Sequence, residues 1–164
     1  MQDWFRHLRY HVRWLEPATG RHSRVSQRQA ADAMEARLDG QWALKSRSHS
    51  RGTIALAAAN HPITCIGIDV EYADPTRPWR EIAAIFMPAS AHSASDTAQL
   101  CRVWTFGEAY RKAFGEVPSP DLLQRIAAMA PPEDEPIAIS VRRFWYSEPL
   151  RDGFWLSLVW EEVF

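Results

Sequence analysis

Apolar and polar residues alternate in several short stretches of the chain, which is the pattern of a half-buried β-strand. In stretch 8–14 apolar residues alternate with Arg and His, and in stretch 66–71 they alternate with Gly67, Asp69 and Glu71. We predict strands at these two positions and at three others: 53–59, 137–146 and 154–160, the last two forming a hairpin around Asp152 and Gly153.

A helical period of apolar residues appears in other stretches, and capping residues mark their ends. The pattern predicts helices at four positions: 26–38 with Ser26 and Gln29 as a capping box and Gly40 as its end, a short helix after Pro78 that ends at Pro88, a helix from the N-cap Asp96 to Gly115, and a short helical stretch over 122–129. We predict a polar turn over 46–52, a turn at His61-Pro62 and a loop over 89–95.

Length and composition bound the fold. A chain of 164 residues that is 46% apolar and has eight Trp is expected to bury a core as a single domain. The predicted strands and helices are interspersed without a regular strand–helix–strand alternation, which favours the α+β class.

Charge and apolar run length limit the partners. The net charge of −1 argues against a general nucleic-acid binder. The first 51 residues nevertheless hold ten Lys and Arg against five Asp and Glu, which is either an anion-binding surface or a solvated Arg-rich face. No apolar run approaches the roughly 20 residues of a membrane span. The amino terminus has no signal-peptide core, and Cys65 and Cys101 show no metal-ligand spacing. We expect a soluble cytoplasmic protein with reduced thiols, without nucleic-acid or membrane partners.

Three acidic residues in two segments carry the candidate chemistry. Asp69 and Glu71 leave one face of the predicted strand roughly 6.5–7 Å apart. Glu108 and Lys112 lie one turn apart on a helix. Three carboxylates beside a cation suit a magnesium site for a phosphate-bearing substrate, because Mg²⁺ prefers carboxylates, waters and phosphate oxygens. The alternatives are a polar strand end that faces water and a surface ion pair between Glu108 and Lys112.

The segments of the chain resemble the 4′-phosphopantetheinyl transferases of the larger, two-halved type, to which the holo-acyl-carrier-protein synthases are related. The resemblance rests on motifs in the family's order: Ser48-His49-Ser50, the Gly-x-Asp-x-Glu strand from Gly67 to Glu71, and the helix from Trp104 to Lys112. It covers roughly residues 40–160. The chain departs from the family pattern at Gly107, where the family has Lys, and in a short first half.

The resemblance implies one domain, 1–164, made of two related α+β halves, about 1–62 and about 63–164, around a central cleft. It implies Mg²⁺-dependent transfer of 4′-phosphopantetheine from coenzyme A to a serine of an apo acyl or peptidyl carrier protein, with release of adenosine 3′,5′-bisphosphate. The alternative is a weak or inactive relative that binds coenzyme A or carrier protein.

The resemblance also implies roles for single residues. Asp69, Glu71 and Glu108 would hold Mg²⁺. Glu108 would also be the general base, and Lys112 would stabilise charge on the transferring phosphate. Ser48 and His49 would contact coenzyme A. Lys45 and Arg47 are candidates for its 3′-phosphate on charge and proximity.

Overall fold

The computed structural model describes residues 6–16, 22–38, 40–87, 96–131 and 135–163, and it places their strands in two antiparallel sheets. The first sheet has the order β1-β3-β2, and the second has the order β4-β7-β6-β5. The strands are β1 (Leu8–Trp14), β2 (Leu44–Ser50), β3 (Thr53–Ala59), β4 (Ile63–Tyr72), β5 (Ile137–Ala138), β6 (Arg143–Pro149) and β7 (Phe154–Glu162). The helices are α1 (Arg24–Glu35), α2 (Trp79–Ala83), α4 (Thr97–Phe114) and α5 (Pro120–Ala128).

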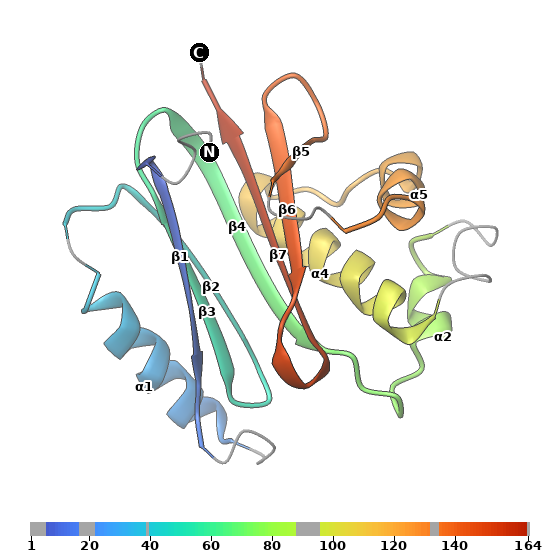
Figure 1. The fold of residues 1–164 in the computed structure, drawn as a ribbon, viewed down its shortest axis with the longest axis horizontal. Helices are drawn as coiled ribbons and strands as arrows, with labels where there is room; N and C mark the ends of the chain where they lie inside the picture. The colour runs from blue at the N-terminus through green and yellow to red at the C-terminus, as the bar shows by residue number, and fades with distance from the viewer. Residues whose placement is uncertain (1–5, 17–21, 39, 88–95, 132–134, 164) are drawn as a thin grey trace.

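The sheets and helices form layers: α1, the first sheet, the second sheet, and then α4 with α2 and α5 (Figure 1). One apolar cluster fills the space between the two sheets and includes Ala55 and Ala57 of β3, Ile68 of β4 and Leu156 of β7. A second cluster lies between the second sheet and its helices, and a small third one joins α1 to Ile54. Because both faces of β3 and most of β4 are covered, these strands are almost continuously buried.

The two sheets share one chain path. In each, a strand is followed by a helix and then by two strands of which the last lies between the other two: β1, α1, β2, β3 in the first and β4, α4, β6, β7 in the second. The second sheet adds α2, α5 and the short edge strand β5 to this path. The chain passes from one sheet to the other at residues 60–62. The α+β class is therefore confirmed, and the repeated path is compatible with two related halves that meet near residue 62.

Most predicted elements are present. Asp96 caps α4 by accepting a hydrogen bond from the Gln99 amide, and Gly115 ends α4 in the left-handed conformation, with φ of 71°. The tail strands β6 and β7 form the predicted hairpin, and Trp145, Phe154 and Trp160 are buried. The short helix α2 ends at Ala83, so its predicted end at Pro88 is wrong. The predicted loop at 89–95 lies outside the described residues.

Three further boundaries were predicted wrongly. The first helix begins after Ser23, whose hydroxyl accepts from the Ser26 amide, and it ends at Glu35. The predicted strand 137–146 is divided into β5 and β6 by a turn in which the Ile139 amide donates to the Arg143 carbonyl. The polar segment 46–50 belongs to strand β2, and only Arg51 and Gly52, both with positive φ, make the turn. The serine-rich composition of this segment led to the wrong prediction of a turn, because the inward side chains of β2 are serines.

No helix within the described stretches is both long and apolar enough to cross a membrane.

Candidate functional site

From Ile66 onward, strand β4 directs its even-numbered apolar residues into the cluster between the sheets and its odd-numbered residues to the opposite face. Ile68 and Val70 are buried in the cluster between the sheets. Gly67 lies directly under α4: a Cβ atom at Gly67 would be 1.9 Å from the Ala109 carbonyl oxygen. The missing side chain therefore lets α4 pack on β4 close to Asp69. The predicted alternation of this strand is confirmed.

Strands β2 and β4 are the end strands of their sheets, and they meet side by side through side chains. The hydroxyl of Ser46 accepts from the Ile68 amide at 3.1 Å, and the hydroxyl of Ser48 donates to Asp69 Oδ1 at 2.7 Å. The hydroxyl of Ser50 donates to Glu71 Oε1. These successive bonds show that the two strands run in the same direction. We call this contact the serine seam, formed by Ser46, Ser48 and Ser50 of β2 against residues 68–71 of β4.

Lys112 of α4 closes the serine seam from the helix side. Its ammonium donates to Asp69 Oδ1 at 2.8 Å, to the Ile68 carbonyl at 3.0 Å and to the Arg47 carbonyl at 3.3 Å. An ammonium has three N–H donors, so all of them have acceptors here. One side chain of α4 thus binds both β2 and β4, which belong to different sheets. The structure therefore brings Ser48, Asp69 and Lys112 into direct contact.

Glu71 lies next to Asp69 along β4 and has its own partners. Its Oε1 atom accepts from Ser50 and from the Tyr72 amide at 3.0 Å, and its Oε2 atom accepts from Arg77 at 3.0 Å. Ser50 and Arg77 were not among the predicted site residues. Ser50 could have been found by pairing the alternate serines of β2 with the alternate acids of β4. Arg77 lies in a loop, where no periodic pattern marks it.

Glu108 is on the same helix as Lys112 but does not join Asp69 and Glu71. Its carboxylate accepts from Arg111 at 2.9 Å, an exposed pair three residues apart. The predicted surface pair with Lys112 does not form, because the ammonium of Lys112 is used by the serine seam. Among the described residues no three His, Cys, Asp or Glu side chains lie close enough to hold a metal ion.

The three predicted magnesium ligands therefore do not fit one cation in the described geometry. Each carboxylate instead has a basic partner: Lys112 for Asp69, Arg77 for Glu71 and Arg111 for Glu108. Two carboxylates, Asp69 and Glu71, remain adjacent and are of the oxygen type that Mg²⁺ prefers. We assign no chemical step to the ion on this geometry, and its role stays a prediction.

Gly107, the position at which the chain departs from the family pattern, has open space beside it. A Cβ atom there would meet no heavy atom of the described residues within 4 Å. Gly107 also lines a small cavity of about 100 Å³ together with Trp104, Glu108 and Val117. Among the described residues no neighbour packs closely against this glycine, and the space lies beside Glu108.

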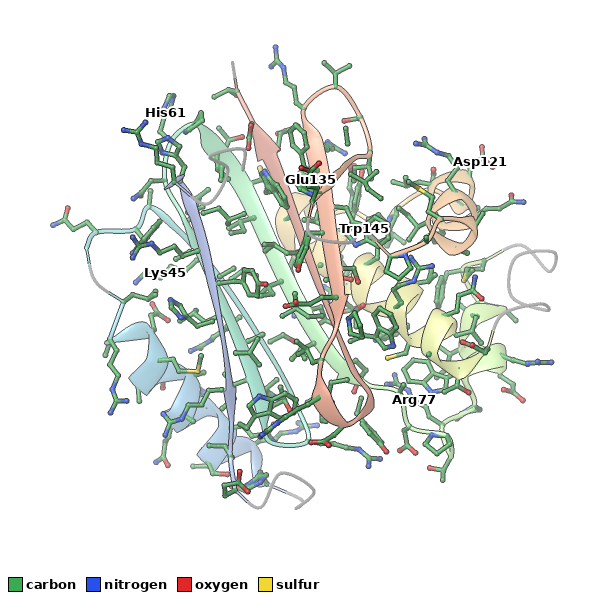
Figure 2. The ribbon with its side chains drawn as sticks, viewed as in Figure 1. Lys45, His61, Arg77, Asp121, Glu135 and Trp145 are labelled. Atoms are coloured by element: carbon green, nitrogen blue, oxygen red, sulfur yellow. The ribbon has the colours of Figure 1, made fainter. Side chains whose placement is uncertain are left out.

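The residues predicted for the nucleotide end of coenzyme A lie on the outer face of β2, near α1. The Lys45 ammonium donates to Glu35 at 2.9 Å, and the Arg47 guanidinium donates to Asp32 at 2.5 Å. Both pairs are substantially exposed, so they contribute little to folding. Lys45 and Arg47 also line a cavity of about 270 Å³ (Lys45 is labelled in Figure 2). His49 is exposed on the same strand.

Burial sets the protonation of Asp69. The residue is 6% exposed, and burial raises its pKa from 3.8 to about 6, although Lys112 and Ser48 oppose the rise. In the unfolded chain this carboxyl loses its proton near its ordinary pKa, whereas in the folded chain it keeps the proton until about pH 6. Stability from this group is therefore present below about pH 4 and is lost as pH rises through about 6.

We expect this pH dependence to disappear in Asp69→Asn. Relative to that variant, the wild-type protein should lose on the order of 2–3 kcal/mol of unfolding free energy between pH 4 and pH 7. Urea unfolding at a series of pH values in a chelating buffer measures the difference. A constant difference across this range would show that Asp69 titrates near its ordinary value.

In comparisons with known proteins, no protein-family model and no curated protein matches the chain.

Proposed function

We propose that this protein transfers 4′-phosphopantetheine from coenzyme A to a serine of an apo acyl or peptidyl carrier protein, with the serine seam as its site. The observation that carries the proposal is the meeting of three separate motifs. Ser48 and Ser50 come from the first motif, Asp69 and Glu71 from the second, and Lys112 from the third. They are distant in sequence but connected by direct hydrogen bonds.

In the proposed reaction the serine hydroxyl of the carrier attacks the phosphorus that bears the pantetheine arm. A new P–O bond forms to serine, the P–O bond to adenosine 3′,5′-bisphosphate breaks, and the serine proton passes to a base. Glu108 is the proposed base, directly or through water. It lines the small cavity on the α4 surface and is partly exposed, so a partner hydroxyl can approach it.

Lys112 is the proposed cation for the transferring phosphate. To bind the phosphate, its ammonium must release one of its three acceptors. The Arg47 carbonyl is the most distant of them, at 3.3 Å, and is the one we expect it to release. Its pair with Asp69 at 2.8 Å keeps the ammonium in place meanwhile. A positioned cation of this kind stabilises charge that develops during phosphoryl transfer without the cost of reorganising water.

The nucleotide end is assigned to the cavity of about 270 Å³ beside β2. Lys45 and Arg47 supply two cations there, and their exposed pairs with Glu35 and Asp32 are weak enough to exchange for a phosphate. His49 lies on the same outer face of β2. This placement puts the 3′-phosphate and the pyrophosphate of coenzyme A on opposite sides of one strand.

A catalytically weak or inactive relative that binds coenzyme A or carrier protein is the second candidate. The specific observation in its favour is that every predicted acid has a basic partner and that Glu108 is outside the serine seam. The missing Lys at position 107 acts in the same direction.

The deciding experiment is mass spectrometry of a panel of apo carrier proteins incubated with the protein, coenzyme A and Mg²⁺. A gain of the phosphopantetheine mass supports the transferase, and coenzyme A binding without transfer supports the inactive relative.

In Glu108→Gln, which keeps the size of the side chain but removes its charge, transfer should fall by at least about 10²-fold at saturating Mg²⁺. Near-normal turnover in that variant would return Glu108 to a surface ion pair.

A further inference from the structure

Arg77 is the positive partner of Glu71, and its backbone is held firmly. It lies in the loop between β4 and α2 (labelled in Figure 2). In this loop Asp74 Oδ1 accepts from both the amide and the hydroxyl of Thr76, and the Arg77 amide donates to the Asp74 carbonyl at 3.1 Å. Arg51, from the turn between β2 and β3, also pairs with Asp74. The loop is therefore tied to itself and to the other sheet.

Two tryptophans fix the direction of the Arg77 side chain. Its guanidinium lies 4.4 Å from the centroid of the Trp79 ring and 5.1 Å from that of Trp104. A cation within about 6 Å of an aromatic face is attracted to it, and the planar guanidinium also stacks well. Trp79 is itself held, because its indole N–H donates to the Asp74 carbonyl at 2.8 Å. The two rings therefore hold the same guanidinium that bonds to Glu71.

The clamped guanidinium donates a hydrogen bond to Glu71 Oε2 at 3.0 Å. Arg77 is 31% exposed and Glu71 is 23% exposed, so the pair is screened less than a surface pair. The other oxygen of Glu71 accepts from Ser50 of the first sheet. Without Arg77, one oxygen would have no partner among the described residues, and the carboxylate would carry an uncompensated charge.

We propose that Arg77 is a positioning residue of the site: a guanidinium held by Trp79 and Trp104 that fixes the orientation and balances the charge of Glu71. This inference rests on the proposed function in that Glu71 must belong to the site where phosphate binds. An unbalanced carboxylate beside the phosphates of coenzyme A repels them, and a rotating one loses its contact with the serine seam. Arg77 acts through Glu71 and does not touch substrate.

The test is a double-mutant cycle with Arg77→Gln, Glu71→Gln and the double variant, read as kcat/KM for transfer. Arg77→Gln should lose about 10- to 100-fold in kcat/KM, the range for residues that hydrogen-bond and orient metal-ligating carboxylates. In the Glu71→Gln background the same change should have little further effect, because contacting residues are not additive. Arg77→Lys, which keeps the charge but not the planar fork, should recover part of the loss.

Arg151 provides a matched control. Its guanidinium also stacks on a tryptophan, 4.2 Å from the centroid of the Trp14 ring, but its acidic neighbours Glu16 and Asp152 lie outside the site. Arg151→Gln should therefore leave kcat/KM unchanged. Circular dichroism of every variant shows whether the fold is retained.

Crystal structures of the wild-type protein and Arg77→Gln give a second readout that needs no activity. The Glu71 carboxylate should leave the Ser50 hydroxyl or occupy more than one position in the variant. Should Glu71 keep its place, or should the two substitutions prove additive, the positioning role is overturned. If the wild-type protein transfers nothing, the proposed function fails, while the two crystal structures still decide whether Arg77 positions Glu71.

Discussion

Gly67→Ala is expected to lower the free energy of unfolding by at least about 3 kcal/mol, the upper part of the range for overpacked cores. The new methyl carbon would be 1.9 Å from the Ala109 carbonyl oxygen and 2.7 Å from the Ala113 amide nitrogen. Both atoms belong to the backbone of α4, so no side-chain rotation relieves the clash. The helix must move away from β4, and Lys112 must move with it.

Gly107→Ala is the matched control on the same helix. Its new Cβ meets nothing in the described part of the chain within 4 Å, and alanine outranks glycine in a helix interior by about 1 kcal/mol. This variant should therefore be more stable than the wild-type protein. Urea unfolding measures both effects in one series. Equal stability of Gly67→Ala and the wild-type protein would show that α4 does not pack on β4 as closely as described.

Lys112→Met is expected to cost about 3–5 kcal/mol, the range for removing one member of a buried ion pair. The methionine keeps the aliphatic stem but leaves the Asp69 carboxylate, whose side chain is 9% exposed, without its cation. The carbonyls of Ile68 and Arg47 also lose a donor. The loss should be smaller at acid pH, where Asp69 takes up a proton and no longer needs a cation.

Two comparisons isolate the charge of Asp69. Lys112→Met combined with Asp69→Asn should be more stable than Lys112→Met alone, because the unpaired charge is gone. Arg111→Met, which breaks the exposed pair with Glu108 on the same helix, should cost at most about 1 kcal/mol. If Lys112→Met costs no more than Arg111→Met, Lys112 is a surface residue and the serine seam does not depend on it.

The repeating local patterns were predictable from the sequence. A period of two placed Asp69 and Glu71 on one face of a strand, and the cap Asp96 and the terminal Gly115 defined α4 within a residue. These features depend on the preferences of a few neighbouring residues, so they can be recognised before any long-range contact is known. The α+β class followed from the order of these elements.

Strand β2 was predicted as a turn for a physical reason. Its inward residues are Ser46, Ser48 and Ser50, whose partners are the amide and carboxylates of β4 and not an apolar core. A strand whose buried face is polar has no hydrophobic alternation to detect. Serine-rich composition then favours a turn unless the facing strand is known.

The sequence by itself determined that Asp69 and Glu71 share one face of a strand and that Lys112 lies on a later helix. The tertiary structure alone decided the partners: Lys112 pairs with Asp69 and not with Glu108, and Arg77 pairs with Glu71. These choices depend on the alignment of β2 with β4 and on the close approach of α4 over Gly67. Both are set by packing between segments that lie tens of residues apart in the sequence. A charged side chain pairs with whichever opposite charge the fold brings near it, and local sequence does not encode which one that is.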